Sequence, residues 1–166
     1  MKRYYPVLVL AGVLISYFFY FSQRYVIGLP APYSECLQAR YFIIDTWDKD
    51  IQEGDLVAFY MSNENHFYPS GLPWVKLVAA GPNSTVEVTP SQVKVSGRDP
   101  IDLDMIFLLN VVLMDNPIGS VEEFSKTHTL GEDEYFLVGD THLSYDSRFW
   151  GYMKESDIRG KAYAIF

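Results

Sequence analysis

The N-terminal part of the chain is a continuous apolar run. Residues Tyr4 to Phe21 carry no charged side chain and only one clearly polar residue, a serine. Lys2 and Arg3 precede the run, and Arg24 follows it. About 18 to 20 apolar residues are enough to span a hydrocarbon core of about 30 Å. The pattern therefore predicts a membrane-spanning helix at this end of the chain.

A cleaved signal peptide is the alternative interpretation of the same run. Such a peptide has an apolar core of about 7 to 15 residues, followed soon by a small-x-small cleavage site. The run here is longer, and residues 22–25 offer no such site. We therefore expect residues 1–24 to form a cytoplasmic start and an uncleaved transmembrane anchor, with Lys2 and Arg3 favouring a cytoplasmic N-terminus.

Beyond the anchor, the pattern changes to short apolar runs and alternating positions bounded by Gly, Pro, Asn or Asp. Short runs rich in Val, Ile, Phe and Tyr are typical of β-strands. The fold class is therefore expected to be mostly β, behind one N-terminal transmembrane helix. The expected strands are Tyr41–Asp45, Leu56–Met61, Trp74–Ala80, Thr85–Thr89, Gln92–Ser96, Ile106–Leu113, Tyr135–Gly139 and Ala162–Phe166.

The breaks between these runs predict the remaining organisation. Pro90 and Ser91 separate two expected strands and indicate a hairpin. One short helix is expected at Ser120–Lys126, because its first residue can cap a helix and acidic residues follow it. Residues 25–40 contain Gly28, Pro30 and Pro32 and are expected to be a connector. Residues 41–166 are expected to form an extracytoplasmic β-rich domain.

Composition and charge narrow the function classes. The chain has 166 residues, 49% hydrophobic and 16% aromatic, which excludes a mainly disordered chain. Its net charge of −8 argues against a nucleic-acid partner, which needs a basic surface. The single cysteine, Cys36, excludes an intramolecular disulfide and metal sites built on several thiolates. The three histidines lack paired ligand spacing, so we expect no metal site.

Two segments outside the anchor could carry chemistry. Lys76 is a lone charge inside an apolar run; an ammonium is costly to bury, and a neutral amine can serve as a general base. A lysine on the exposed face of a half-buried strand fits the sequence equally well. Residues 139–151 are the densest polar cluster, in which Asp146 and Arg148 can form a charge-assisted pair, although an ordinary turn is the alternative. The only thiol, Cys36, could be a small buried hydrophobe, as most free cysteines are, although its surroundings are not typical of a core strand.

Taken together, these segments resemble the type I signal peptidase family, a set of membrane-anchored serine proteases with a Ser–Lys dyad. The resemblance covers nearly the whole chain, with the boxes in the same order. The matching segments are the closing signature, Gly139-Asp140, Ser144-x-Asp146-Ser147-Arg148-x-Trp150-Gly151 and Ile158-x-Gly160-Lys161-Ala162, the lysine box Val75–Gly81, and the Gly-Asp strand Gln52–Val57.

The small size, without a large inserted domain, resembles the TraF-type branch of this family. That resemblance implies processing of pilin-like or secreted precursors for conjugative transfer, with transpeptidation or cyclisation as a further outcome. The implied partners are the precursor, the membrane and other transfer or type IV secretion components, with no cofactor. The implied location is the bacterial inner membrane, with a single pass, a cytoplasmic N-terminus and a periplasmic catalytic domain.

The resemblance also assigns roles to the nucleophile segment. The nucleophilic serine of the family falls on Cys36, and the hydroxyl that helps to hold the oxyanion falls on Ser34. The proline and glycine of the family box fall on Gln38 and Arg40, so this box departs from the pattern. A thiol is intrinsically more nucleophilic than a hydroxyl. The implied catalytic pair is therefore Cys36 and Lys76, with the Cys36 amide as a second oxyanion donor.

The remaining site residues follow from the closing signature. By resemblance, Ser144 orients Lys76, while Asp146, Arg148 and Asp140 support the site. Other interpretations stay open at this point: a nucleophile at position 34 with the register shifted by two, a catalytically inactive peptidase-like scaffold that binds pilin or secretion components, and an unrelated anchored β-domain with chance matches.

Overall fold

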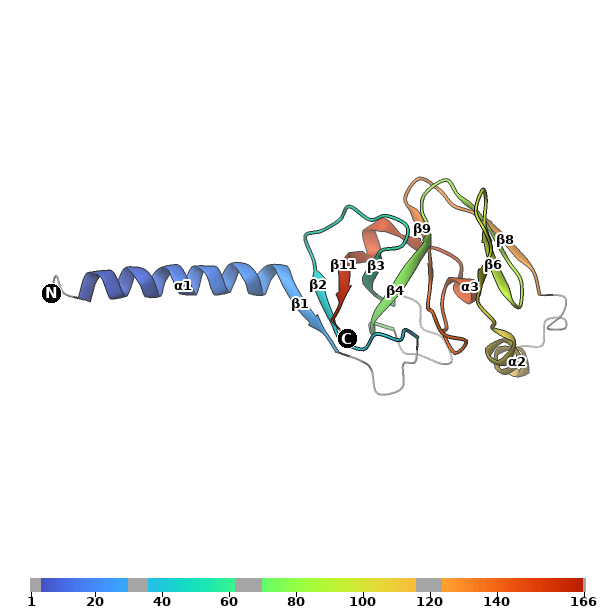
Figure 1. Cartoon of the computed structure of the whole chain (residues 1–166), viewed down its shortest axis with the longest axis horizontal. Helices are drawn as coiled ribbons and strands as arrows, with labels where there is room; N and C mark the ends of the chain where they lie inside the picture. Colours follow the sequence, from blue (N-terminus) through green and yellow to red (C-terminus); the bar gives the residue numbers. More distant parts are fainter. Residues whose placement is uncertain (1–3, 30–35, 62–69, 116–123, 166) are drawn as a thin grey trace.

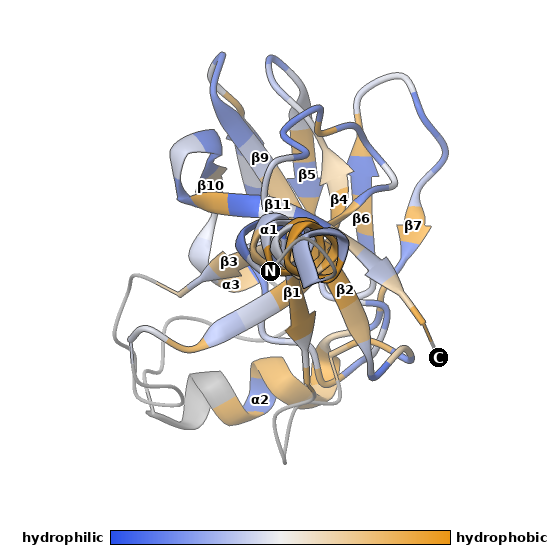
Figure 2. Cartoon of the chain, turned by 90° about the vertical axis from the view of Figure 1, so that its left-hand side faces the viewer, coloured by the Kyte–Doolittle hydropathy of each residue, from blue (hydrophilic) through white to orange (hydrophobic). Residues whose placement is uncertain are grey.

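The computed structural model describes residues 4–29, 36–61, 70–115 and 124–165, and within residues 112–115 only the backbone. Helix α1 (Tyr5–Arg24) projects from a β-rich body (Figure 1) and contains no buried residue. It is long and apolar enough to cross a membrane, and Figure 2, which looks along it, shows its apolar colouring. These residues coincide with the expected anchor.

The larger sheet has seven strands in the order β1-β2-β11-β3-β4-β9-β10, and all its neighbouring strands run antiparallel. Strand β4 lies between β3 and β9 and carries Lys76. The strands are β1 (Tyr25–Gly28), β2 (Phe42–Asp45), β3 (Leu56–Tyr60), β4 (Pro73–Ala80), β9 (Glu134–Val138), β10 (Met153–Lys154) and β11 (Ile158–Ala164).

The smaller sheet has four strands in the order β7-β6-β5-β8, namely β7 (Ile101–Asp102), β6 (Gln92–Val95), β5 (Thr85–Val88) and β8 (Lys126–Thr129). The β5–β6 pairing confirms the hairpin across Pro90 and Ser91. Alternate residues of this hairpin are buried, as expected for a strand with one face on the core. Its valines pack with Phe136 and Val138 of β9, which joins the two sheets through one core. The mostly β prediction is confirmed.

The expected strand Ile106–Leu113 is wrong, because this segment is helix α2 (Ile106–Asp115). The segment is apolar on nearly all sides, and periodicity cannot separate a helix from a strand in such a run. Local hydrogen bonds stabilise the helix. The Asp104 carboxylate accepts the Ile106 N–H at 2.9 Å, as an N-cap does, and the Asn110 amide donates to the Ile106 carbonyl one turn earlier.

The expected helix Ser120–Lys126 lies mostly outside the described residues, and its last residue begins strand β8 instead. Strand β8 pairs with β5 across the smaller sheet, although its polar sequence lacks apolar alternation. The connector expected at residues 25–40 begins with strand β1, which pairs with β2. Two short helical elements were also not predicted, α3 (Ser147–Trp150) and a 3-10 turn at Glu155–Asp157.

Candidate active site

Lys76 is completely buried in the middle of the larger sheet. It pairs with Val57 of β3. Its Nζ donates a hydrogen bond of 2.7 Å to Ser144 Oγ, and it lies 4.9 Å from the ring centroid of Trp74, two residues earlier on the same strand. Lys76 is therefore not a solvated lysine on an exposed strand face.

The hydrogen bond from Lys76 continues into a directed chain. Ser144 Oγ donates to Asp146 Oδ2 at 2.7 Å. A carboxylate only accepts, and a hydroxyl has a single proton. The Ser144 proton is therefore committed to Asp146, and the Lys76 amine must be the donor toward Ser144. This arrangement uses one N–H of the amine and fixes the position of its nitrogen.

Asp146 and Arg148 form a buried ion pair that holds this chain in place. Arg148 Nε and Nη2 each donate to a different oxygen of Asp146 at 2.7 Å, and neither side chain is exposed. The guanidinium also donates to the backbone carbonyls of Leu103 and Ser144, both at 3.2 Å. A buried pair needs such complete hydrogen bonding to offset its desolvation. The predicted charge-assisted pair is confirmed.

Helix α3 attaches this ion pair to the sheet. The Asp146 carboxylate caps the helix by accepting the Arg148 N–H, and it also accepts the Gly139 N–H at 2.9 Å. Ser147 Oγ accepts the Leu137 N–H of β9 at 3.0 Å. One carboxylate thus connects Ser144, the arginine and the end of β9.

The main chain at Cys36 lies against the same end of β9. The Cys36 carbonyl accepts the Asp140 N–H at 3.1 Å, and the Asp140 carboxylate accepts the Gln38 N–H at 3.0 Å. A Cβ at Gly139 would overlap both the Cys36 carbonyl and Ser144 Oγ. The backbone of Cys36 and the hydroxyl bonded to Lys76 therefore meet at a position that only glycine can occupy. Cys36 is partly exposed, and Ser34 lies outside the described residues.

The electrostatics of this cluster, which we call the lysine cluster (Lys76, Ser144, Asp146 and Arg148), are unusual. Arg148 neutralises the charge of Asp146. Within the described part of the chain, no carboxylate lies within ion-pair distance of Lys76. An ammonium without a counter-ion is costly in a fully buried site, whereas an uncharged amine is much less so.

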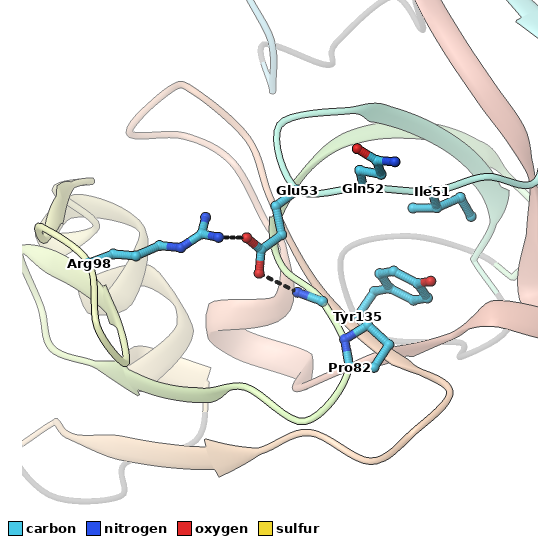
Figure 3. Close-up of a pocket in the computed structure, with 7 residues that line it drawn as sticks. Ile51, Gln52, Glu53, Pro82, Arg98 and Tyr135 are labelled. Atoms are coloured by element: carbon cyan, nitrogen blue, oxygen red, sulfur yellow. Dashed lines mark hydrogen bonds and ion pairs between the residues drawn. The ribbon is translucent and has the colours of Figure 1, made fainter.

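A surface hollow lies away from the lysine cluster, where the two sheets meet (Figure 3). The Glu53 carboxylate pairs with Arg98 of the smaller sheet's β6–β7 turn and accepts the Gly81 N–H at 3.1 Å. The hollow has a volume of about 430 Å³ and is lined by Ile51, Gln52, Glu53, Gly81, Pro82, Arg98 and Tyr135. It shares no residue with the lysine cluster, so we assign the Glu53–Arg98 pair a structural role that links the sheets.

The sequence of the whole chain, residues 1–166, matches the family model for signal peptidase, peptidase S26. The chain belongs to this family. It is 27% identical over 119 residues to a signal peptidase I from Leptolyngbya laminosa, which covers 69% of this chain and 52% of that protein. The chain therefore spans about half the length of this curated relative. A crystal structure of a signal peptidase I from Enterococcus faecalis V583 is 22% identical, covers 69% of this chain and 97% of that one, and has a TM-score of 0.45.

Membership of the family confirms the broader resemblance drawn from the sequence motifs. The structure brings Lys76, Ser144, Asp146 and Arg148 together through hydrogen bonds, and it brings the Cys36 main chain and Asp140 beside them.

Three contacts in the cluster had not been anticipated from the sequence. They are the Trp74 ring beside the Lys76 amine, the Ser147 hydroxyl bonded to β9, and the Leu103 carbonyl bonded to Arg148. The first has a sequence signal, because residues two apart on a strand lie on the same face. The Leu103 carbonyl has none, since any residue supplies a carbonyl.

Proposed function

We propose that the chain is a membrane-anchored signal-peptidase-like endopeptidase that uses Cys36 as nucleophile and Lys76 as general base. One observation carries the proposal: a fully buried lysine amine, held by Ser144, lies beside the docking point of the Cys36 main chain. A structural lysine has little reason to be desolvated in this way. A general base, in contrast, needs a neutral amine held at a fixed position.

The proposed reaction starts at the thiol. The neutral Lys76 amine takes the proton from Cys36 Sγ, and the thiolate attacks the scissile carbonyl. The oxyanion is held by the Cys36 N–H and the Ser34 hydroxyl, the roles that the family resemblance gives to these groups. As the C–N bond breaks, the Lys76 ammonium returns the proton to the leaving amine, and the acyl group remains on sulfur as a thioester.

The thioester is resolved by an incoming nucleophile. Water gives a linear product, and an amine of the substrate gives transpeptidation or cyclisation. In both cases Lys76 accepts the proton of the nucleophile, and Cys36 leaves as the thiolate. Both products are accessible because a thioester is open to attack by water and by amines.

The proposed substrates are precursor proteins that emerge at the membrane surface. Helix α1 is consistent with a single-pass anchor, and the basic N-terminal residues favour a cytoplasmic start. The β-rich body would then lie on the extracytoplasmic side of the bacterial inner membrane. On the resemblance to the TraF-type branch, we propose pilin-like precursors of conjugative transfer as the substrate class.

Precursor processing in cells tests this proposal. Cys36→Ala and Lys76→Ala are expected to leave a co-expressed precursor uncut, Cys36→Ser to retain part of the activity, and Ser34→Ala to slow processing without abolishing it. Normal processing by Cys36→Ala together with complete loss in Ser34→Ala would move the nucleophile to position 34. Binding of the precursor without processing by the wild type would support the alternative of an inactive scaffold, which the departures at Gln38 and Arg40 suggest.

A further inference from the structure

The anchor helix continues into the catalytic sheet with no intervening loop (Figure 1). Helix α1 ends at Arg24, and β1 begins at Tyr25, whose N–H donates to the Phe21 carbonyl. Strand β1 then pairs with β2 along its whole length. The orientation of the sheet relative to the helix is therefore set by contacts at this junction.

Both ends of Arg24 are held by two consecutive residues, Asp45 at the end of β2 and Thr46 directly after it. The Arg24 guanidinium donates to both oxygens of Asp45, from Nε at 2.9 Å and from Nη2 at 2.5 Å. The N–H and the hydroxyl of Thr46 each donate to the Arg24 carbonyl at 2.9 Å. Asp45 is only 4% exposed, and its hydrogen bonds from Arg24 lower its pKa. This is a partly buried, bidentate pair, the geometry in which ion pairs are strongest.

Aromatic rings surround this pair at the point where α1 would leave a membrane. The Trp47 ring meets the Tyr20 ring edge-on at 5.2 Å, and the Arg24 guanidinium lies 5.8 Å from the Trp47 ring and 5.1 Å from the Tyr25 ring. Trp47 is 52% exposed. Tyrosine and tryptophan favour the membrane–water interface. We call Tyr20, Arg24, Asp45, Thr46 and Trp47 the junction.

The junction is connected to the lysine cluster by one row of paired residues. Tyr25 pairs with Asp45, Asp45 with Lys161, Lys161 with Val57, and Val57 with Lys76. The row crosses five strands in four steps. At about 4.8 Å per step, it places Lys76 roughly 20 Å from the end of the anchor. A hydrogen-bonded sheet is stiff across such a row, and a rotation at the junction would therefore move the site.

We propose that Arg24 and Asp45 are positioning residues that fix the height and tilt of the active site above the membrane and so select which peptide bond of a membrane-borne precursor is cut. The inference rests on the proposed function. A precursor whose own apolar segment is held in the same bilayer presents each of its bonds at a set distance from the surface. An active site held rigidly at one height above the membrane can therefore reach the peptide bonds in only one part of that precursor.

The height of the site can be measured without catalysis, because Cys36 is the only cysteine. The full chain in lipid vesicles carries a donor fluorophore on Cys36, with acceptor lipids in the bilayer. The wild type is expected to give one narrow distribution of energy transfer. Arg24→Ala, Asp45→Asn and a flexible Gly-Ser insertion between residues 24 and 25 are expected to shift and broaden it. Arg159→Ala, which removes an arginine bonded to Tyr60 instead of the anchor, is the matched control and should leave it unchanged.

Site selection is measured on the unlabelled protein with a precursor that carries identical cleavage sequences at successive distances from its apolar segment. The wild type is expected to cut one of them, and the junction variants to lose that selectivity while cutting a soluble peptide as fast as the wild type. Unchanged selectivity and unchanged energy transfer in the Gly-Ser insertion would overturn the inference, even if a point variant fails to fold. A wild type that cuts neither substrate would overturn the proposed function, while the energy-transfer result would still decide whether the junction is rigid.

Discussion

Lys76 donates a hydrogen bond of 2.7 Å to Ser144, and neither side chain is exposed to solvent. The two residues are separated by 68 positions in the chain. Their contact depends on the pairing of β4 with β9 and on the turn after β9, in which the Ser144 N–H donates to the Thr141 carbonyl. The position of the proposed base is therefore a product of the fold, and the following variants test its supports one at a time.

Ser144→Ala removes the acceptor of the Lys76 hydrogen bond. Without this acceptor the amine is no longer held at one position, and a displacement of about 1 Å can cost about 10²-fold in rate, so we expect kcat/KM for a precursor peptide to fall about 10- to 100-fold. Steady-state kinetics in detergent would measure this. Ser156→Ala, at an exposed serine, is the matched control and should behave like the wild type. Unchanged kinetics in Ser144→Ala would show that Ser144 does not position the base.

Asp146→Ala leaves the Arg148 guanidinium buried without its counter-ion. Breaking a buried pair in this way costs about 3–5 kcal/mol, which corresponds to a fall in Tm of about 6–20 °C for a domain of this size. Thermal unfolding in detergent would check it. The control is Asp133→Ala, which breaks an exposed pair with Lys154 of 3.7 Å and should change stability by less than about 1 kcal/mol. Equal Tm values for the two variants would contradict this role for the buried pair.

Gly139→Ala places a methyl group where the Cys36 carbonyl and the Ser144 hydroxyl now meet. The segment around Cys36 must move, and a displacement of about 1 Å in a proposed nucleophile can cost about 10²-fold in rate. We expect a loss of that order in kcat with a smaller effect on binding. Gly12→Ala, in a helical position with open space around it, should retain full activity. An active Gly139→Ala enzyme would mean that the Cys36 main chain need not lie against Ser144 during catalysis.

We expect His128 to make the stability of the fold depend on pH. Burial, with a further contribution from nearby Lys126, lowers the pKa of His128 below its ordinary value of 6.5. The neutral form is therefore favoured in the folded state, and its stabilisation is present above about pH 6.5 and is lost as the pH falls through the lower folded pKa. Tm should fall between pH 7.5 and 5.5, and the fall should be smaller in His128→Asn. His142→Gln, at an exposed histidine, should keep the wild-type dependence, and an identical fall in all three proteins would exclude His128 as the cause.

The sequence predicted the structure correctly where the signal comes from residues close together in the chain. The short apolar runs on either side of Pro90 and Ser91 predicted the β5–β6 hairpin, and the two-residue spacing of Asp146 and Arg148 allowed their pairing to be predicted. It failed at α2, because a run that is apolar on all sides has no period. It also left the burial of Lys76 open, because burial there depends on strands that lie far apart in sequence. The row from Tyr25 to Lys76 depends on the register of four strand pairs, which no local pattern specifies.

In the proposed reaction, acyl transfer passes through the sulfur of Cys36. The most direct measurement is intact-mass analysis of the full chain quenched during turnover of a precursor peptide, followed by peptide mapping and treatment with neutral hydroxylamine, which cleaves thioesters. We predict an added acyl mass on the peptide containing Cys36 that hydroxylamine removes, and its accumulation should be abolished in Cys36→Ala and strongly slowed in Lys76→Ala. An acyl mass that resists neutral hydroxylamine and persists in Cys36→Ala would exclude Cys36 as the nucleophile and assign that role to an oxygen.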